Sequence, residues 1–384
     1  MKNVVLKTCL TTLVLSMSGL AAASDEVKLL SAEYKYSSHA AIAGGALSVA
    51  ADSEIDGDLA AQAALVIGAG AIAQNVYAGA AVSTGSDSTV KNIYGGAAAG
   101  IATNAIADTI TAGAAITVGA GGKAQHFYAG AAITLGAGTT QLAIGDSLVL
   151  AGAARTGTLI ALTDNDETAA DAALRVKYLA SAGSDLRHSA ALTKGAASFD
   201  MPTALTHIDN AYTALATLTK TDDVVGGQQY TLGTSVANVT LAPGVYQGGA
   251  VNAPANAVIK LDAGNSNNRV WIFNLTDAVT LGAGTQINTD LAGDNATIIW
   301  NVGGALNLGA GAKFAGIAIV KGSVTGATAD LTCGNLYAKG AVSIGSIGSV
   351  DGGNPEVCQQ SAKKINSFFI NETAADRIGY SLFK

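Results

Sequence analysis

The sequence predicts a mainly β protein, namely a right-handed β-solenoid (β-helix) with one long α-helix packed along its side. Three observations predict this fold. A short apolar phrase recurs at a fixed spacing, glycines close each copy of it, and an amphipathic helical pattern interrupts the copies. Periodicity on this scale indicates a stack of small units in which each unit buries the face of its neighbour.

The repeat is clearest as YAGAAITLG at residues 128–136. Related phrases start at residues 60, 77, 94 and 111, and each start lies 17 residues before the next. The phrase returns near the C-terminus, where copies start at Val279, Leu306, Val324 and Val342, the last two steps being 18 residues. A rung of this length is too short to contain a helix. It suits three short strands joined by tight turns, whose glycines supply positive φ.

Composition supports a folded chain rather than a disordered one. Charged residues make up 13% of the 384 residues and aromatic residues 5%, and the abundant small residues are periodic. The formal net charge of −7 makes nucleic acid a poor partner. Beyond the N-terminal segment, no run of eighteen apolar residues lacks polar breaks, so we expect no membrane span in the mature chain.

The N-terminal segment 1–23 is typical of a secretory signal. Lys2 and Lys7 precede an apolar run that ends in three alanines, which predicts cleavage near Ala23. We therefore expect a secreted or extracellular protein, with the periplasm or the cell surface as other destinations. Residues 24–66 then contain a polar leader and the first strand-like pieces.

The segment 67–199 consists of Ala/Gly-rich rungs followed by a probable helix. The 17-residue rungs run to about Gly136, and the periodicity stops after Ala154. Residues 164–179 then have acidic residues at the start of a helical pattern, which is typical of a capped helix.

A second helix is predicted from about 202 to 218, at the start of the segment 200–350 that holds the later rungs. Pro202 fits the first turn of a helix. The apolar residues at helical spacing are Leu205, Ile208, Tyr212, Leu215 and Leu218. This single apolar stripe needs a surface to cover it, and the side of the solenoid is available. The remaining residues, 351–384, form a cap or tail.

Cysteine usage leaves two interpretations open. Cys9 lies in the predicted signal, so Cys333 and Cys358 remain in the mature chain. An even pair in an exported protein suggests a disulfide that ties the tail to the last rungs, and two free buried thiols are the alternative.

Six segments together carry a resemblance to a known family. They are IDNAY at 208–212, LAPGVY at 241–246, NRVWIFNL at 268–275, IWNVGGALNLG at 299–309, FAGIAI at 314–319 and LYAKGAV at 336–342. This ordered set resembles the microbial ice-binding proteins that have a discontinuous β-solenoid flanked by one long helix. AIAGG at 41–45 and IDGDL at 55–59 resemble that family's N-terminal strand, which packs beside the C-terminal rungs.

The resemblance covers roughly residues 40–66 and 200–350. It implies that residues 41–59 pair with C-terminal rungs far from them in sequence. Residues 68–199 depart from the family pattern by being much longer than the usual connection. They are interpreted as extra rungs, a separate cap or a second solenoid.

No catalytic, metal or cofactor site is predicted. The histidines are scattered and lack the spacing of metal ligands. The acidic residues sit singly in predicted turns rather than in the cluster that a solenoid lyase or hydrolase needs.

The remaining candidate site is a column of small, mostly polar residues, one per rung. It follows the inward aliphatic residue and comprises Ser83, Gly100, Thr117, Thr134, Thr280, Asn307, Thr325 and Ser343. Alternation places this position on the outer face, and successive rungs lie about 4.8 Å apart. Such a column forms a flat, regular array of methyl and hydroxyl groups that is suited to ordering surface water.

The candidate ice-binding residues are Thr280, Thr285, Asn307, Thr325 and Ser343, with Thr117 and Thr134 as a secondary set. Gly100 and Asn307 interrupt the hydroxyl ladder, and Ala312 stands at the position that Thr285 and Thr139 occupy in other rungs. The predicted function is therefore that of an exported, non-catalytic ice-binding protein. Such a protein is antifreeze-like, inhibits recrystallisation, and has ice or ordered surface water as its partner.

The alternative is a surface or extracellular-matrix protein that uses the solenoid as a spacer or adhesin. Its partners would be cell-surface or matrix components. A polysaccharide-acting solenoid enzyme is the weakest reading, because no acidic cluster supports it.

Overall fold

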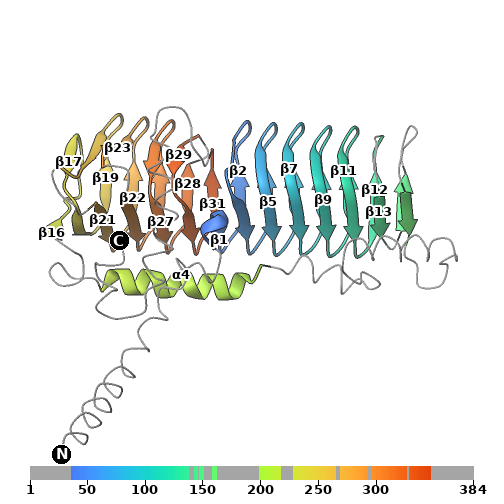
Figure 1. Cartoon of the computed structure of the whole chain (residues 1–384), viewed down its shortest axis with the longest axis horizontal. Coiled ribbons are helices and arrows are strands. Elements are labelled where there is room, and N and C mark those ends of the chain that lie inside the picture. The colour runs from blue at the N-terminus through green and yellow to red at the C-terminus, as the bar shows by residue number, and fades with distance from the viewer. Residues whose placement is uncertain are drawn as a thin grey trace, which may run out of the picture.

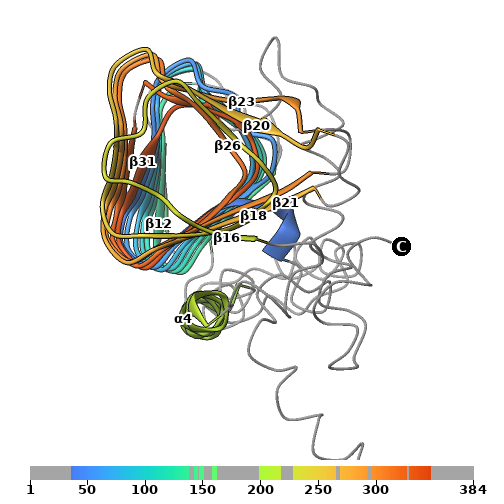
Figure 2. The ribbon, with the colours of Figure 1, turned by 90° about the vertical axis from the view of Figure 1, so that its left-hand side faces the viewer.

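The first rung of the chain lies in the middle of the molecule, not at one end. The structure is a computed structural model, and it describes residues 36–137, 142–145, 147–150, 158–161, 199–217, 228–264, 269–292, 296–326 and 328–346. All strand pairs in it are parallel, and they form three long sheets. The strands coil around a common axis, and Figure 2 shows the three-sided outline seen along that axis.

Sheet A has 14 strands, and the helix lies outside it. In spatial order they are β15 (Thr158–Ala161), β13 (Leu142–Gly145), β11 (Lys123–Ala129), β9 (Ile106–Ala112), β7 (Thr89–Gly95), β5 (Ile72–Ala78), β3 (Asp58–Ala61), β1 (His39–Ala43), β30 (Leu336–Ala338), β27 (Ile317–Val320), β24 (Thr297–Val302), β21 (Val270–Leu275), β18 (Gly244–Gly248) and β16 (Gln228–Thr231).

Sheet B has 12 strands, most of them three residues long. In spatial order they are β14 (Ser147–Leu150), β12 (Ala132–Leu135), β10 (Ile116–Val118), β8 (Ala99–Ile101), β6 (Val82–Thr84), β4 (Leu65–Ile67), β2 (Leu47–Val49), β31 (Val342–Ile344), β28 (Val324–Gly326), β25 (Leu306–Leu308), β22 (Val279–Leu281) and β19 (Val251–Ala253).

Sheet C has five strands and closes the coil in the later part of the chain. They are β17 (Val239–Leu241), β20 (Val258–Asp262), β23 (Gln286–Leu291), β26 (Lys313–Ala315) and β29 (Asp330–Cys333). We call β1–β15 the N-terminal block and β16–β31 the C-terminal block.

The two blocks are joined in register at their first and last rungs. Ala41 of β1 pairs with Leu336 of β30, and Leu47 of β2 pairs with Val342 of β31. Strand order then runs outward from β1 to β15 in one direction and from β30 to β16 in the other. Figure 1 shows the resulting single row, with the first rung beside the last one. The predicted pairing with C-terminal rungs is confirmed for residues 41–43 and 47–49, whereas Asp58 and Leu59 belong to β3, which pairs with β1 and β5.

The described rungs after residue 68 continue the same stack. β5, β7, β9, β11, β13 and β15 extend sheet A, while β6, β8, β10, β12 and β14 extend sheet B. Of the three interpretations of the long segment, extra rungs therefore fit the strands up to Ala161.

The interior changes character along the axis. In the C-terminal block Tyr246, Phe273 and Trp300 stack in adjacent rungs, with ring centroids 5.1 and 3.9 Å apart. In the N-terminal block the corresponding inward column is Val76, Ile93, Ile110 and Phe127, and all four are buried. Three of these four side chains are smaller than the aromatic residues of the C-terminal block, which suits the shorter 17-residue rungs because protein interiors are close-packed.

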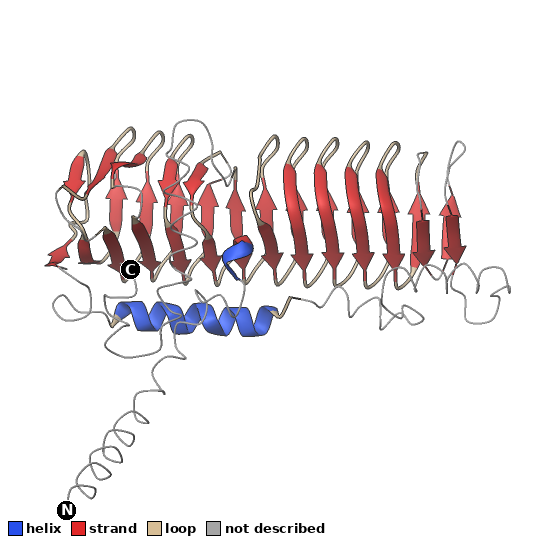
Figure 3. Ribbon diagram, viewed as in Figure 1, coloured by secondary structure: helices blue, strands red, loops and turns tan. Residues whose placement is uncertain are grey.

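Helix α4 (Met201–Ala216) lies against the outer surface of sheet A, along the C-terminal block and the junction (Figure 3). Asp200 caps it by accepting a hydrogen bond from the Thr203 backbone N–H at 3.2 Å. The residues that it buries are Met201, Ala204, Ile208, Ala211 and Leu215. They pack against outward residues of sheet A such as Ile272 and Ile319.

The buried stripe is thus rotated from the predicted one. Leu205 and Tyr212 are only partly buried at its border, and Leu218 lies outside the described residues. The small residues Ala204 and Ala211 take the central positions, because they let the helix approach the sheet closely.

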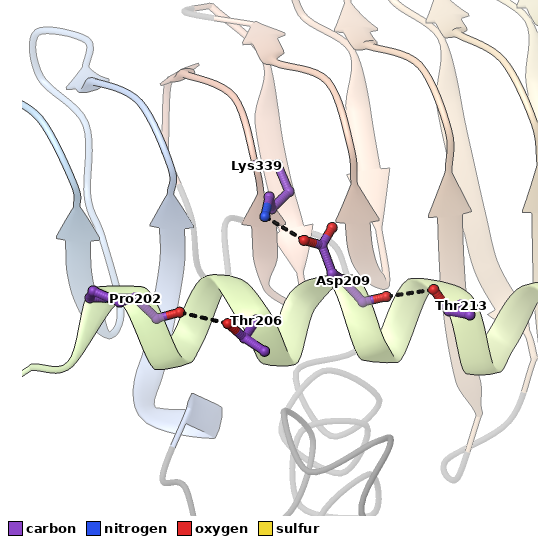
Figure 4. A network of polar contacts seen from close by, with 5 residues as sticks. All are labelled: Pro202, Thr206, Asp209, Thr213 and Lys339. Atoms are coloured by element: carbon purple, nitrogen blue, oxygen red, sulfur yellow. Dashed lines mark hydrogen bonds and ion pairs between the residues drawn. The ribbon is translucent and has the colours of Figure 1, made fainter.

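Polar contacts fix the helix to the C-terminal block. Asn274 and Asn301 of sheet A donate to the carbonyl oxygens of Leu215 and Tyr212 at 2.8 and 3.0 Å. Leu215 belongs to the last turn, where helix carbonyls need partners from outside the helix. Near the junction, Lys339 pairs with Asp209, as Figure 4 shows.

Several predictions fall on residues that the structure does not describe. They are the signal segment 1–23, the helix over 164–179, the tail 351–384 and the disulfide, since Cys358 and the side chain of Cys333 are outside the description. Within the described part of the chain, no helix is long and apolar enough to cross a membrane.

Candidate functional site

The outer surface of sheet B presents one residue from the middle of each short strand. In strands such as β4, β6 and β10, the two end residues are buried and the middle one is exposed. The inward ends are aliphatic in most rungs, so the core fixes which residue points outward. The middle residue is therefore the one that can meet a ligand on this face.

These middle residues form one continuous central column. Each is the backbone partner of the next across the sheet. In spatial order they are Asn252, Thr280, Asn307, Thr325, Ser343, Ser48, Val66, Ser83, Gly100, Thr117 and Thr134. With about 4.8 Å per rung, the 12-stranded sheet is about 50 Å long.

A second column of small residues lies directly before the strands, and we call it the alanine column. Its carbonyl oxygens accept hydrogen bonds from the first residue of the neighbouring strand, and its members are half-buried or exposed. They are Ala278, Ala305, Ser323, Ala341, Ala46, Ala64, Ala81, Ala98 and Ala115. On the other side, glycine or alanine follows most of the strands.

The face is consequently flat and uncharged. Neither column contains Asp, Glu, Lys, Arg or an aromatic residue. Within the central column the Thr325 hydroxyl donates to Asn307 Oδ1 at 2.8 Å, which restrains both side chains. Asn307 therefore belongs to the polar array and, contrary to expectation, does not interrupt it.

Six of the seven candidate residues lie in the central column. Thr325 and Thr117 are exposed, and the other four are half-buried. These four are Thr280, Asn307, Ser343 and Thr134. Their membership of the column places all six on the outer surface of sheet B.

The seventh candidate, Thr285, was wrongly expected on the outer face. It is 0% exposed, and its hydroxyl donates to the Pro254 carbonyl oxygen at 3.0 Å. The preceding Gly284 has φ 68°, so the chain turns a corner there before Thr285 enters the core. The same inward position holds Ala257, Ala312 and Ala329, all buried, so Ala312 does not weaken any outer array.

Sequence reasoning missed three members of the column. Asn252 precedes the first recognised C-terminal phrase, and Ser48 and Val66 lie in the rungs next to the junction. The alignment of AAQAALVIG at residues 60–68 with the later phrases already contained the signal for Val66. The place of Ser48 beside Ser343 depends on the fold, because no local spacing relates the two ends of the chain.

Several polar side chains elsewhere on the solenoid have structural partners. At one edge Asn75 donates to Asp58 and Asn92 donates to Asn75, each at 2.8 Å, which gives a side-chain ladder along the stack. Burial, followed by the nearby Asp58 carboxylate, raises the pKa of Tyr77 to about 12, and its ring stacks on Tyr94. Among the described residues, no three His, Cys, Asp or Glu side chains gather as metal ligands would.

Comparison with known proteins gives the family. The sequence model of the family described as Ice-binding-like matches residues 97–349. A curated relative, ice-binding protein K3-B1 of Typhula ishikariensis, is 35% identical over 92 residues, which is 24% of this chain and 36% of the relative. The chain thus spans about a third of that relative's length.

Solved structures of ice-binding proteins are similar at low identity. One from the Antarctic ascomycete Antarctomyces psychrotrophicus is 18% identical, covering 82% of this chain and 96% of the other, with a TM-score of 0.38. The ice-binding protein 1 domain of Shewanella frigidimarina is 16% identical, covering 84% and 93%, with a TM-score of 0.39. The matched segment, residues 97–349, covers well over half of the sequence. This match shows that the chain belongs to the Ice-binding-like family.

Proposed function

We propose that the protein is an exported, non-catalytic ice-binding protein that contacts ice with the outer surface of sheet B in the C-terminal block. Its contact residues are Thr280, Asn307, Thr325 and Ser343, together with the alanine column beside them. The observation that carries the proposal is the flat, uncharged array of small polar and methyl groups held in register by the backbone.

An ice surface differs from other ligands in being flat, extended and made only of ordered water. Single contacts with it are weak, so binding needs many of them at once on a surface that does not have to reorganise. Charged side chains hold their own hydration shell, and long side chains lose rotamer freedom on binding. The small residues of sheet B avoid both costs.

The other faces suit this role less well. Sheet A is covered by α4 along the C-terminal block, where Ile272, Ile299 and Ile319 pack under the helix. Sheet C presents Lys260 and Lys313 on its outer side, and both are exposed. Sheet B thus combines flatness, exposure and the absence of charge. Export through the predicted signal would bring this face to ice outside the cell.

The test is inhibition of ice recrystallisation and shaping of single crystals by the purified mature chain. Thr325→Tyr places a ring in the middle of the face, and we expect it to raise the required protein concentration several-fold at an unchanged melting temperature. Thr240→Tyr is the matched control, since Thr240 is an exposed strand-centre residue on sheet C. It should behave as the wild type.

Two results would count against the proposal. A wild-type chain that leaves crystals round and coarsening like an inert protein would favour the spacer or adhesin function. A folded Thr325→Tyr variant with full activity would mean that ice meets another surface.

A further inference from the structure

We infer that the ice-contacting surface continues across the junction of the two chain ends onto the N-terminal block, so that the inserted rungs supply a second half of the site. This inference rests on the proposed function. It adds Ser48, Val66, Ser83, Thr117 and Thr134 as contact residues, and it identifies Gly100 as the position that limits the strength of this half.

The backbone crosses the junction as it crosses any other pair of rungs. Ser343 pairs with Ser48, and the ladder on either side of them is unbroken. Val342 N–H donates to the Ala46 carbonyl oxygen at 2.9 Å, and Ala50 N–H donates to the Ile344 carbonyl oxygen at 2.9 Å. The outer surface of sheet B therefore continues from β31 to β2 without a break in the strand ladder, so a flat ligand can contact both halves.

Differences in rung length do not disturb the face. Thr280 and Asn307 are 27 residues apart in sequence, whereas Thr117 and Thr134 are 17 apart, yet both pairs are neighbours on sheet B. The extra residues of the longer rungs follow β20 and β23 of sheet C, where Asp262 and Leu291 end those strands. Sheet B is thus kept regular across both blocks while another side of the coil absorbs the variation.

The chemistry of the face is also similar on both halves, which are both uncharged and made of small residues. The alanine column runs unbroken from Ala341 through Ala46 to Ala115. In the central column Val66 is 44% exposed and has the shape of threonine, so it keeps the surface flat although it lacks the hydroxyl. Gly100, Thr117 and Thr134 lie within the segment 97–349 that matches the Ice-binding-like family.

Gly100 leaves a notch between Ser83 and Thr117. A Cβ built on Gly100 would have no neighbour closer than the Val82 carbonyl oxygen at 4.0 Å, so the backbone there accepts a Cβ without a clash. Threonine is also favoured over glycine in a strand. Gly100→Thr would therefore complete a run of hydroxyl residues from Ser83 to Thr134.

The experiment measures recrystallisation inhibition and crystal growth for the mature chain and for four single variants. We expect Gly100→Thr to lower the concentration needed for half-inhibition, and Gly100→Tyr and Ser83→Tyr to raise it several-fold. Thr89→Tyr is the control, because Thr89 is exposed in the same rung as Ser83 but begins a strand of sheet A. It should match the wild type, and thermal melting should show that each variant is folded.

The outcomes separate this inference from the proposed function. If Gly100→Thr and the folded tyrosine variants all keep wild-type activity while Thr325→Tyr loses it, the site ends at the junction and the inference is wrong. If the wild type is inert, or Thr325→Tyr is fully active, the proposed function itself fails. Should the tyrosine variants not fold, Gly100→Thr alone decides, since a gain in activity supports the inference and no gain overturns it.

Discussion

Ser48 and Ser343 are backbone partners on sheet B, although they come from opposite ends of the described chain. The middle of the solenoid is therefore formed by two neighbouring rungs that are far apart in the sequence. Contacts between such distant segments carry a large loop-closure cost, which the surrounding packing has to offset. The junction is consequently the place where stability and the continuity of the face depend on the same residues.

The close approach of the first rung to the last rung predicts that Gly44 tolerates no side chain. A Cβ at Gly44 would lie 2.2 Å from the Lys339 carbonyl oxygen, so the first and last rungs would have to move apart. We expect Gly44→Ala to lower the free energy of unfolding by about 1–3 kcal/mol. Gly249→Ala is the control, because nothing lies within 4 Å of its Cβ, and denaturant titration should find it nearly neutral. Equal stability of the two variants would contradict the tight junction.

Burial of Thr285 predicts a stability effect without a binding effect. Thr285→Val keeps the shape of the side chain but removes the donor to the Pro254 carbonyl oxygen, which should cost about 1 kcal/mol. Recrystallisation inhibition per folded molecule should stay at the wild-type level. Thr280→Tyr should show the reverse pattern, with unchanged melting and weaker inhibition. A loss of activity in a fully stable Thr285→Val variant would reinstate Thr285 as a contact residue.

The two kinds of contact between α4 and the solenoid should differ in strength. Asp209 and Lys339 have side chains 44% and 32% exposed, so Asp209→Asn should cost less than about 1 kcal/mol. Asn274 is buried, and its amide reaches the Leu215 carbonyl while its oxygen accepts from Asn301 at 3.1 Å. Asn274→Ala leaves buried polar groups unpaired and should cost about 1–3 kcal/mol or more. Thermal denaturation that ranks the two variants in the opposite order would refute this assignment.

Asp200 should make the stability of α4 depend on pH in the acid range. Hydrogen bonds from the Thr203 hydroxyl and backbone N–H hold the pKa of Asp200 below its ordinary value of 3.8. A carboxyl whose folded pKa is lowered stabilises the fold fully above its unfolded pKa. That stabilisation is lost as the pH falls through the folded value. The acid slope of the melting temperature should therefore be shallower in Asp200→Ala than in the wild type, and identical slopes would show that the cap contributes nothing.

The repeats revealed the rungs but not the way in which the chain closes. The 17-residue period aligned Ser83, Thr117 and Thr134 correctly, because core alternation repeats in every rung of that block. The period does not show which rung of one block lies beside which rung of the other. The pairing of the rungs that contain Ser48 and Ser343 was therefore predicted only from the resemblance to a family. Thr285 was misplaced because every threonine of the repeated phrase was taken as outward, whereas Thr285 follows the corner at Gly284 and is buried. The buried stripe of α4 was misjudged because large apolar residues were weighted over Ala204 and Ala211.

Strict periodicity of the N-terminal block predicts that one whole rung can be removed. Ala99 and Ile116 are partners on sheet B, so excising residues 100–116 joins Ala99 to Thr117 in the original register. The shortened chain should fold with a similar melting temperature, because in a solenoid each rung contacts only its neighbours. Excising only residues 100–108 is the control. It brings residues of the wrong side of the coil into sheet B, and circular dichroism should show a destabilised or unfolded block.

The same excision tests how ice affinity depends on the length of the face. It removes the notch at Gly100 together with one rung, and it leaves Ser83 beside Thr117. If the gap is the weak point of this half, the shortened chain should inhibit recrystallisation as well as the wild type despite its smaller area. If area dominates, its activity should fall, while Gly100→Thr in the full-length chain still raises it. A folded, shortened chain with unchanged activity, together with an inert Gly100→Thr substitution, would place the inserted rungs outside the contact with ice.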